Sequence, residues 1–193
     1  MSPRITVLAS GTGSLFRSLL GSQVSDYIAA LITDVPNCGA VGIAQEAGIP
    51  VISVPLTEYS SRVEWDQALL DRVNELEPDL LVTAGFMRIL SETFVESYPN
   101  RIVNSHPALL PLFPGAHAVR DALAANVTTT GCTIHFVDAG VDTGPIIAQQ
   151  SIEVQPGESE EHLHERIKVV ERELLPRTIN TVLADRGLIG DLS

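Results

Sequence analysis

The sequence predicts an α/β fold: a Rossmann-like, doubly wound, mostly parallel sheet with helices on both faces. Short runs of β-branched residues alternate with helical patterns as far as residue 125, which is typical of parallel strands joined by crossover helices. The chain has 193 residues, 45% of them hydrophobic, which is enough for one sizeable core. No repeat, linker or low-complexity tract divides it, so we expect a single domain over residues 1–193.

The first part of the chain alternates between the two patterns. We expect strands at 5–9, 27–33, 51–54, 80–84 and 102–105. The helices between them are expected at 14–20, 38–47, 61–76 and 91–97. The helix at 61–76 is the clearest, because Leu69, Val73 and Leu76 lie on or near one face. Gly48 and Pro78 mark the ends of helices.

The second part begins with a proline-rich loop at 106–115 and a helix at 118–125. Two longer strands are expected at 130–137 and 146–154. The last helix has Ser159 as its N-cap. Its apolar residues follow helical spacing: Leu163, Ile167, Val170 and Leu174. We expect Pro176 to kink this helix, because proline removes a main-chain donor.

Charge narrows the range of partners. The 12 Lys+Arg and 24 Asp+Glu give a formal charge of -12, which disfavours nucleic acid and anionic membrane surfaces because both need clustered cations. No apolar run approaches the roughly 18 residues of a membrane span, and the N-terminal run at 5–9 is too short for a signal peptide. Cys38 and Cys132 suggest neither a disulfide scaffold nor a zinc site. We therefore expect a cytoplasmic protein.

Ligands of doubly wound sheets bind beyond the carboxyl ends of the strands, where this chain first has a glycine turn over residues 10–14, SGTGS. Its amides converge near a helix N-terminus, which favours a phosphate. A plain turn that needs positive φ is the second interpretation. A dinucleotide site is the third: Asp34 occupies the position of a ribose-binding acid, but Phe16 stands where the third glycine would be.

Polar residues also follow the strand at 102–105. Asn104 and His106 point to the same side of that strand, which suits a reaction that develops an oxyanion and moves a proton. A second loop, 138–145, carries Asp138 and Asp142, and a carboxylate there could orient His106. A glycine-rich turn with solvated aspartates is the alternative. A metal site of His106, His135 and Asp142 lacks the usual ligand spacing, so we expect no metal.

These segments, in this order, resemble the glycinamide ribonucleotide formyltransferases of purine synthesis, a folate-dependent formyltransferase family. The resemblance runs nearly end to end and is carried by residues 10–14 (SGTGS), 84–90 (AGFMRIL), 104–111 (NSHPALLP), 114–117 (PGAH), 131–137 (GCTIHFV) and 142–145 (DTGP). The segments AGFMRIL and HPALLP are the most specific. Two positions depart from the family: Leu15, where asparagine is frequent, and Leu112, where many members have a basic residue.

The resemblance implies the formyltransferase fold and the transfer of a formyl group from 10-formyltetrahydrofolate to the amine of 5'-phosphoribosylglycinamide, with no metal. The catalytic residues would be Asn104, His106 and Asp142, supported by Thr133 and His135. The substrate-binding residues would be Gly11, Thr12, Gly13, Ser14, Leu15 and Glu171. The folate-binding residues would be Arg62, Phe86, Met87, Arg88, Ile89, Leu90, Asn104, Asp138, Val141 and Asp142.

On this interpretation, residues from 1 to about 100 bind the phosphate, and those from about 101 to 193 bind folate and carry the chemistry. The resemblance is compatible with a homodimer. The main alternative is a 10-formyltetrahydrofolate deformylase. A non-catalytic folate- or nucleotide-binding module would not need Asn104, His106 and Asp142 together, and all three are present.

Overall fold

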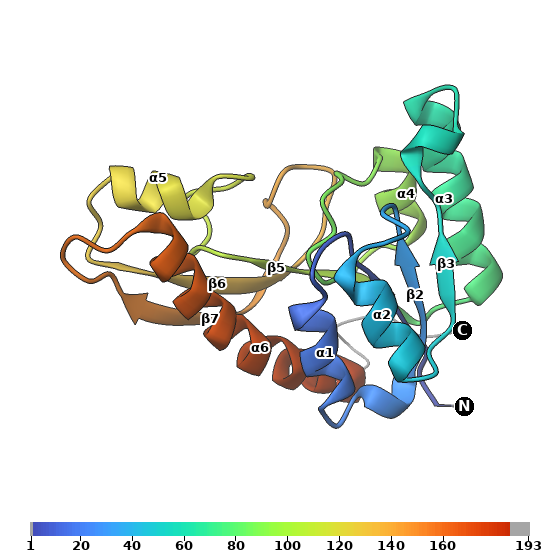
Figure 1. Ribbon diagram of the computed structural model, residues 1–193, viewed down its shortest axis with the longest axis horizontal. Helices are drawn as coiled ribbons and strands as arrows, with labels where there is room; N and C mark the ends of the chain where they lie inside the picture. The colour runs from blue at the N-terminus through green and yellow to red at the C-terminus, as the bar shows by residue number, and fades with distance from the viewer. Residues whose placement is uncertain (1, 186–193) are drawn as a thin grey trace.

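The computed structural model describes residues 2–185 and contains a seven-stranded sheet in the order β3-β2-β1-β4-β5-β6-β7 (Figure 1). Its strands are β1 (Ile5–Leu8), β2 (Ile28–Thr33), β3 (Val51–Ser53), β4 (Leu80–Thr83), β5 (Ile102–His106), β6 (Thr129–Phe136) and β7 (Ile146–Glu153). The neighbours among β1 to β5 pair in parallel, whereas β5–β6 and β6–β7 are antiparallel. The prediction of a mostly parallel sheet is therefore confirmed.

Helices cover both faces of this sheet. They are α1 (Ser14–Leu20), α2 (Gly39–Glu46), α3 (Arg62–Leu76), α4 (Glu92–Ser97), α5 (Ala118–Ala124) and α6 (Glu160–Ala184). One core cluster joins α1, α2 and α6 to a face of the sheet that includes Val7 and Val82. A second cluster joins α3 and α4 to the opposite face, through Leu8 and Leu81. The alternation of neighbouring residues between faces is the period of a β-strand, and it confirms the doubly wound arrangement.

The expected bounds of helices and strands agree with the structure to within one residue at each end up to α6. Local signals explain this agreement. Ser61, Ser91 and Ser159 cap α3, α4 and α6 by accepting a main-chain N–H two or three positions into the helix. The helix α6 contains Pro176, which is buried, and continues to Ala184. The helix is therefore continuous through Pro176, and the kink expected there stays a prediction.

The pair of long strands extends the sheet beyond its parallel part. The strand β6 lies beside β5 with Asn104 opposite His135 and His106 opposite Thr133. This antiparallel register brings polar side chains of two strands to one place, next to the carboxyl ends of β1 and β4. The loops after β1, β4 and β5 follow the carboxyl ends of parallel strands, and the loop after β6 (Figure 1) brings Asp142 back to His106 and Gly115 there.

Among residues 2–185, no helix is both long enough and apolar enough to cross a bilayer.

Candidate active site

Asn104 and His106 lie on β5, and Asp142 joins them from the loop after β6. Nδ1 of His106 lies 3.3 Å from Oδ2 of Asp142, and the Gly115 amide donates to the same oxygen at 2.7 Å. On the other side of the imidazole, Nε2 donates to the carbonyl oxygen of Phe113 at 2.8 Å. Both ring nitrogens of His106 thus face oxygen acceptors, and an imidazolium satisfies both with its two N–H groups.

The amide of Asn104 has a defined orientation. Oγ1 of Thr83 donates to its Oδ1 at 2.7 Å, so Nδ2 is the end that faces His135. Nδ2 lies 3.2 Å from Nε2 of His135, which itself lies 3.6 Å from Oδ1 of Asp142. An amide has two N–H donors, so Asn104 retains one for a substrate oxygen.

Asp142 is held as a carboxylate. The neighbouring His135 contributes most to a pKa below the ordinary value of 3.8, and the Gly115 amide and the charge of His106 add to it, together outweighing partial burial. The backbone of Asp142 is left-handed, with φ 55°, as is that of Phe113. Such conformations are uncommon in residues other than glycine and often lie at functional sites. Here both residues contact His106 directly.

Thr133 and His135 support the site from β6. The Thr133 hydroxyl donates to Ala108 O at 2.6 Å and accepts from Leu110 N at 3.0 Å. Gln149 on β7 donates to the same hydroxyl and to Leu110 O. Thr133 therefore fixes the proline-rich loop that carries Phe113. Gln149 shares this task, and no sequence signal identified it, because its contact depends on the β6–β7 register.

The glycine turn lies between β1 and α1, where it packs closely against α2. Gly13 has φ 77°, and a Cβ there would come within 2.7 Å of Ala40 Cα, so only glycine fits. Phe16 is fully buried in the core, and Leu15 packs against that core. Leu15 can therefore contribute its main chain, and not its side chain, to a ligand at the turn.

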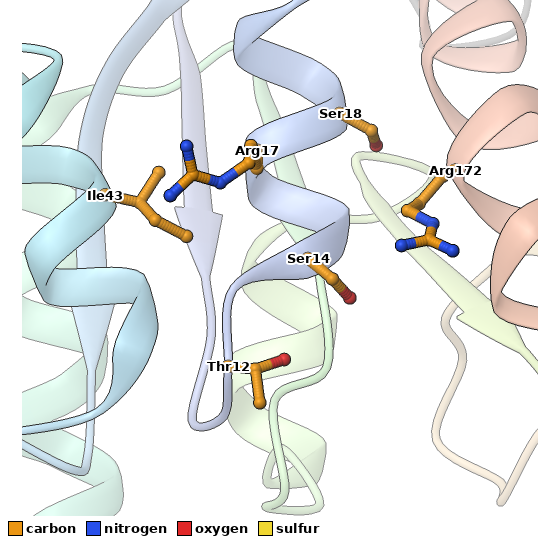
Figure 2. A pocket seen from close by; sticks show the side chains of 6 residues that line it. All are labelled: Thr12, Ser14, Arg17, Ser18, Ile43 and Arg172. Carbon is orange, nitrogen blue, oxygen red and sulfur yellow. The ribbon is translucent and has the colours of Figure 1, made fainter. Parts of the chain in front are cut away.

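A cavity of about 330 Å³ adjoins this turn and is lined by Thr12, Ser14, Arg17, Ser18, Ile43 and Arg172 (Figure 2). Figure 2 shows Ser14 and Ser18 on the side of α1 that faces Arg172, whereas Arg17 points toward Ile43. Arg172 is held in place by a hydrogen bond from its Nε to Lys168 O at 3.0 Å. Arg172 was not predicted as a site residue, because one arginine on a long charged helix carries no signal of its own.

Glu171 lies on the other side of β5 from His106. Oγ of Ser105 donates to its Oε1 at 2.6 Å, and only 5% of Glu171 is exposed. Burial raises the pKa of this carboxyl group, against the hydrogen bond from Ser105. Glu171 is next to Arg172 on α6, but its carboxyl group contacts Ser105 and only Arg172 of the two lines the cavity.

The segment 86–90 follows β4 and exposes apolar side chains. Met87 and Ile89 are 73% and 69% exposed, and Val141 on the loop after β6 is 50% exposed. Phe86 instead stacks on Trp65, with ring centroids 6.4 Å apart, and Leu90 packs against the same core. Met87, Ile89 and Val141 thus present exposed apolar side chains on the loops after β4 and β6.

The charged residues assigned to the folate site make internal contacts. Arg62 contacts Asp66 at 2.7 Å and donates to the carbonyl oxygen of Ile89. Nε of Arg88 donates to Asp34 at 2.7 Å. Oδ1 of Asp138 accepts from the Gly140 amide and the Thr143 hydroxyl within its own loop. Because Asp34 is paired in this way, it does not offer a free carboxylate to a ribose, and the dinucleotide interpretation loses its supporting acid.

The chain is similar to known proteins over most of its length. A family model described as formyl transferase matches residues 3–179. Phosphoribosylglycinamide formyltransferase of Mycobacterium tuberculosis (strain H37Rv) is 52% identical over 96% of this chain and 86% of the relative. The protein of the same name from Bacillus subtilis (strain 168) is 36% identical over 93% of this chain and 94% of its own length.

Solved structures agree. Glycinamide ribonucleotide transformylase 1 from Symbiobacterium toebii has a TM-score of 0.91 at 37% identity, over 96% of this chain and 89% of that chain. Phosphoribosylglycinamide formyltransferase from Brucella melitensis has a TM-score of 0.88 at 34% identity, over 96% and 97% of the two chains. By sequence and by structure, the chain therefore belongs to the formyl transferase family.

Proposed function

We propose that the chain transfers the formyl group of 10-formyltetrahydrofolate to the amine of 5'-phosphoribosylglycinamide, giving formylglycinamide ribonucleotide in purine synthesis. The observation that carries the proposal is the cluster of Asn104, His106 and Asp142, in which the carboxylate lies beside the imidazole of His106 and is linked to the Asn104 amide through His135. The similarity to enzymes of that name supports the same substrates.

In this reaction the neutral amine forms a bond to the formyl carbon, and negative charge grows on the formyl oxygen. The free N–H of Asn104 and the imidazolium of His106 stabilise that oxygen, each by roughly 3–4 kcal/mol when well placed. For this, one ring nitrogen of His106 breaks the hydrogen bond to its present acceptor and donates to the formyl oxygen instead. As the bond between the formyl carbon and the folate nitrogen breaks, Asp142 helps to transfer a proton from the attacking amine to the departing folate nitrogen.

The two substrates occupy different edges of the cluster. The glycine turn at 11–14 binds the phosphate, and Arg172 contributes the cation that the neighbouring cavity offers. Glu171, on the same helix, contacts the rest of that substrate. The exposed Met87, Ile89 and Val141 line the pterin slot, while Arg62 contacts the folate's glutamate tail.

The test is a spectroscopic assay of the folate product, run on the purified chain with and without phosphoribosylglycinamide. We expect folate turnover only when the amine is present, and a formylated amine in equal amount. Release of formate at a comparable rate without the amine would instead identify a deformylase. Sedimentation in the same buffer tests the homodimer, which we infer from the resemblance.

A further inference from the structure

Asp34 is a buried carboxylate outside the reacting cluster. It follows β2, and its side chain is only 1% exposed. Two donors from different loops share it: Oγ of Ser10 at 2.5 Å on Oδ1, and Nε of Arg88 at 2.7 Å on Oδ2. A buried carboxylate that bridges two charged or polar donors forms strong hydrogen bonds, because little water competes for them.

The two donors belong to the two ligand-binding segments. Ser10 opens the glycine turn at 10–14, and Arg88 is the middle of the segment 86–90. The segments also bond directly, since Met87 N donates to Ser10 Oγ at 2.9 Å and Ser10 N donates to Gly85 O at 3.1 Å. Ser10 Oγ thus accepts from the second segment while it donates to Asp34, so the carboxylate fixes the direction of the whole chain of hydrogen bonds.

We infer that Asp34 is a positioning residue that holds the phosphate-binding turn and the folate-binding segment in one fixed arrangement. The inference rests on the proposed function for the identity of the two ligands. Asp34 is placed outside the chemistry, because each of its carboxylate oxygens accepts from a neighbouring segment and its side chain is buried away from the reacting cluster. Its effect reaches both ligands because each of its oxygens holds a different segment.

Steady-state kinetics test this inference. We expect Asp34→Ala to raise KM for the phosphoribosyl substrate and for the folate, each by about tenfold or more, because charge-assisted hydrogen bonds are lost at both segments. The value of kcat should change much less. Asp34→Asn has the same shape and one acceptor oxygen, so it should restore part of each KM. Glu75→Gln, which loosens the exposed Arg72–Glu75 pair on α3, is the matched control.

A double mutant separates the effect of the Asp34–Arg88 contact from that of the Asp34–Ser10 contact. In an Arg88→Met background the hydrogen bond from Arg88 to Asp34 is already lost, so adding Asp34→Ala should raise the folate KM little further. The same addition should still raise KM for the phosphoribosyl substrate through Ser10. If Arg88 acted only by direct contact with the folate, the effects of the two substitutions on the folate KM would instead add.

Hydrogen exchange gives a readout that does not depend on catalysis. Amides of 10–14 and 85–90 should exchange faster together in Asp34→Asn than in the wild type, while the loop at 138–145 is unchanged. Unchanged exchange at both segments, or a rise in only one KM for Asp34→Ala, would overturn the inference. A wild-type chain with no formyl transfer would refute the proposed function, and the exchange experiment would still decide the role of Asp34.

Discussion

Asp142 and Phe113 both have a left-handed backbone, and each places an oxygen against one nitrogen of His106. Two uncommon conformations at one imidazole show how closely the loops after β5 and β6 are adapted to this ring. The ring is buried between them, which strengthens its interaction with the carboxylate relative to water. We therefore expect a substitution of Asp142 to have a large effect on activity.

We predict that Asp142→Asn lowers kcat by roughly 1000-fold, because the imidazolium loses its anionic partner and the proton its carrier. Folate affinity, measured by fluorescence titration, should be nearly unchanged. Asp121→Asn, on the exposed surface of α5, serves as the control. A variant with near-normal kcat would show that the proton does not pass by Asp142.

The lowered pKa of Asp142 also predicts how the free energy of unfolding depends on pH. Its folded pKa lies below the ordinary value of 3.8, so its contribution is full above that value and is lost as the pH falls through the lower folded pKa. In urea titrations from pH 6 downward, the unfolding free energy of the wild type should drop more steeply below about pH 4 than that of Asp142→Asn. Parallel curves would contradict this.

The pKa shift of Glu171, and with it the pH dependence of its contribution to stability, has the opposite sign to that of Asp142. Burial raises its pKa, so its contribution is present at low pH and is lost as the pH rises through the folded pKa. Glu171→Gln keeps an acceptor for Ser105 and removes the buried charge, so it should raise the free energy of unfolding at pH 7. The same variant should raise KM for the phosphoribosyl substrate by about tenfold. Lower stability at pH 7 would show that the charge is compensated in the fold.

At the scale of elements, the cavity between α1 and α6 depends on Arg172 (Figure 2). We predict that Arg172→Ala raises KM for the phosphoribosyl substrate by about tenfold or more and leaves kcat and the folate KM nearly unchanged, because a guanidinium–phosphate contact is lost. Arg177→Ala, at an exposed position of the same helix, is the matched control. Equal effects of the two substitutions would point to a general loss of positive charge.

The helix α6 carries both Glu171 and Arg172, and it begins at a serine cap. Oγ of Ser159 accepts from His162 N at 3.2 Å. Ser159→Ala should reduce the unfolding free energy by about 1 kcal/mol, measured by urea denaturation, without changing kcat. Ser151→Ala, on the exposed strand β7, should cost much less. A comparable loss from Ser151→Ala would mean that the cap contributes nothing specific.

At the scale of the whole molecule, the net charge of -12 does not decide which ligands bind. Global charge acts over about a Debye length, whereas a phosphate responds to the groups that touch it. Two arginines that the resemblance assigns to folate, Arg62 and Arg88, already pair with Asp66 and Asp34. Arg172 instead lines a cavity, and its place there depends on the packing of α6 beside α1, which no local sequence signal reveals.

Much of the fold could be predicted because its signals are local. Strand and helix bounds follow from apolar spacing and from caps such as Ser61 and Ser159, and these operate within a few residues. The direction of β6 could not be predicted from such signals. A helix, α5, separates it from β5 as in a parallel crossover, yet the two strands pair antiparallel. Strand pairing depends on distant segments, which no local window contains.

The same distinction applies to the site. Local spacing alone was enough to place Asn104 and His106 on one side of a strand, since side chains alternate with a period of two. The folded chain was needed to show that Asp142 contacts His106, that Thr83 orients Asn104, and that Asp34 joins Ser10 to Arg88. These contacts form between segments far apart in the chain, so they depend on sheet register and loop closure and cannot be encoded in the spacing of neighbouring residues.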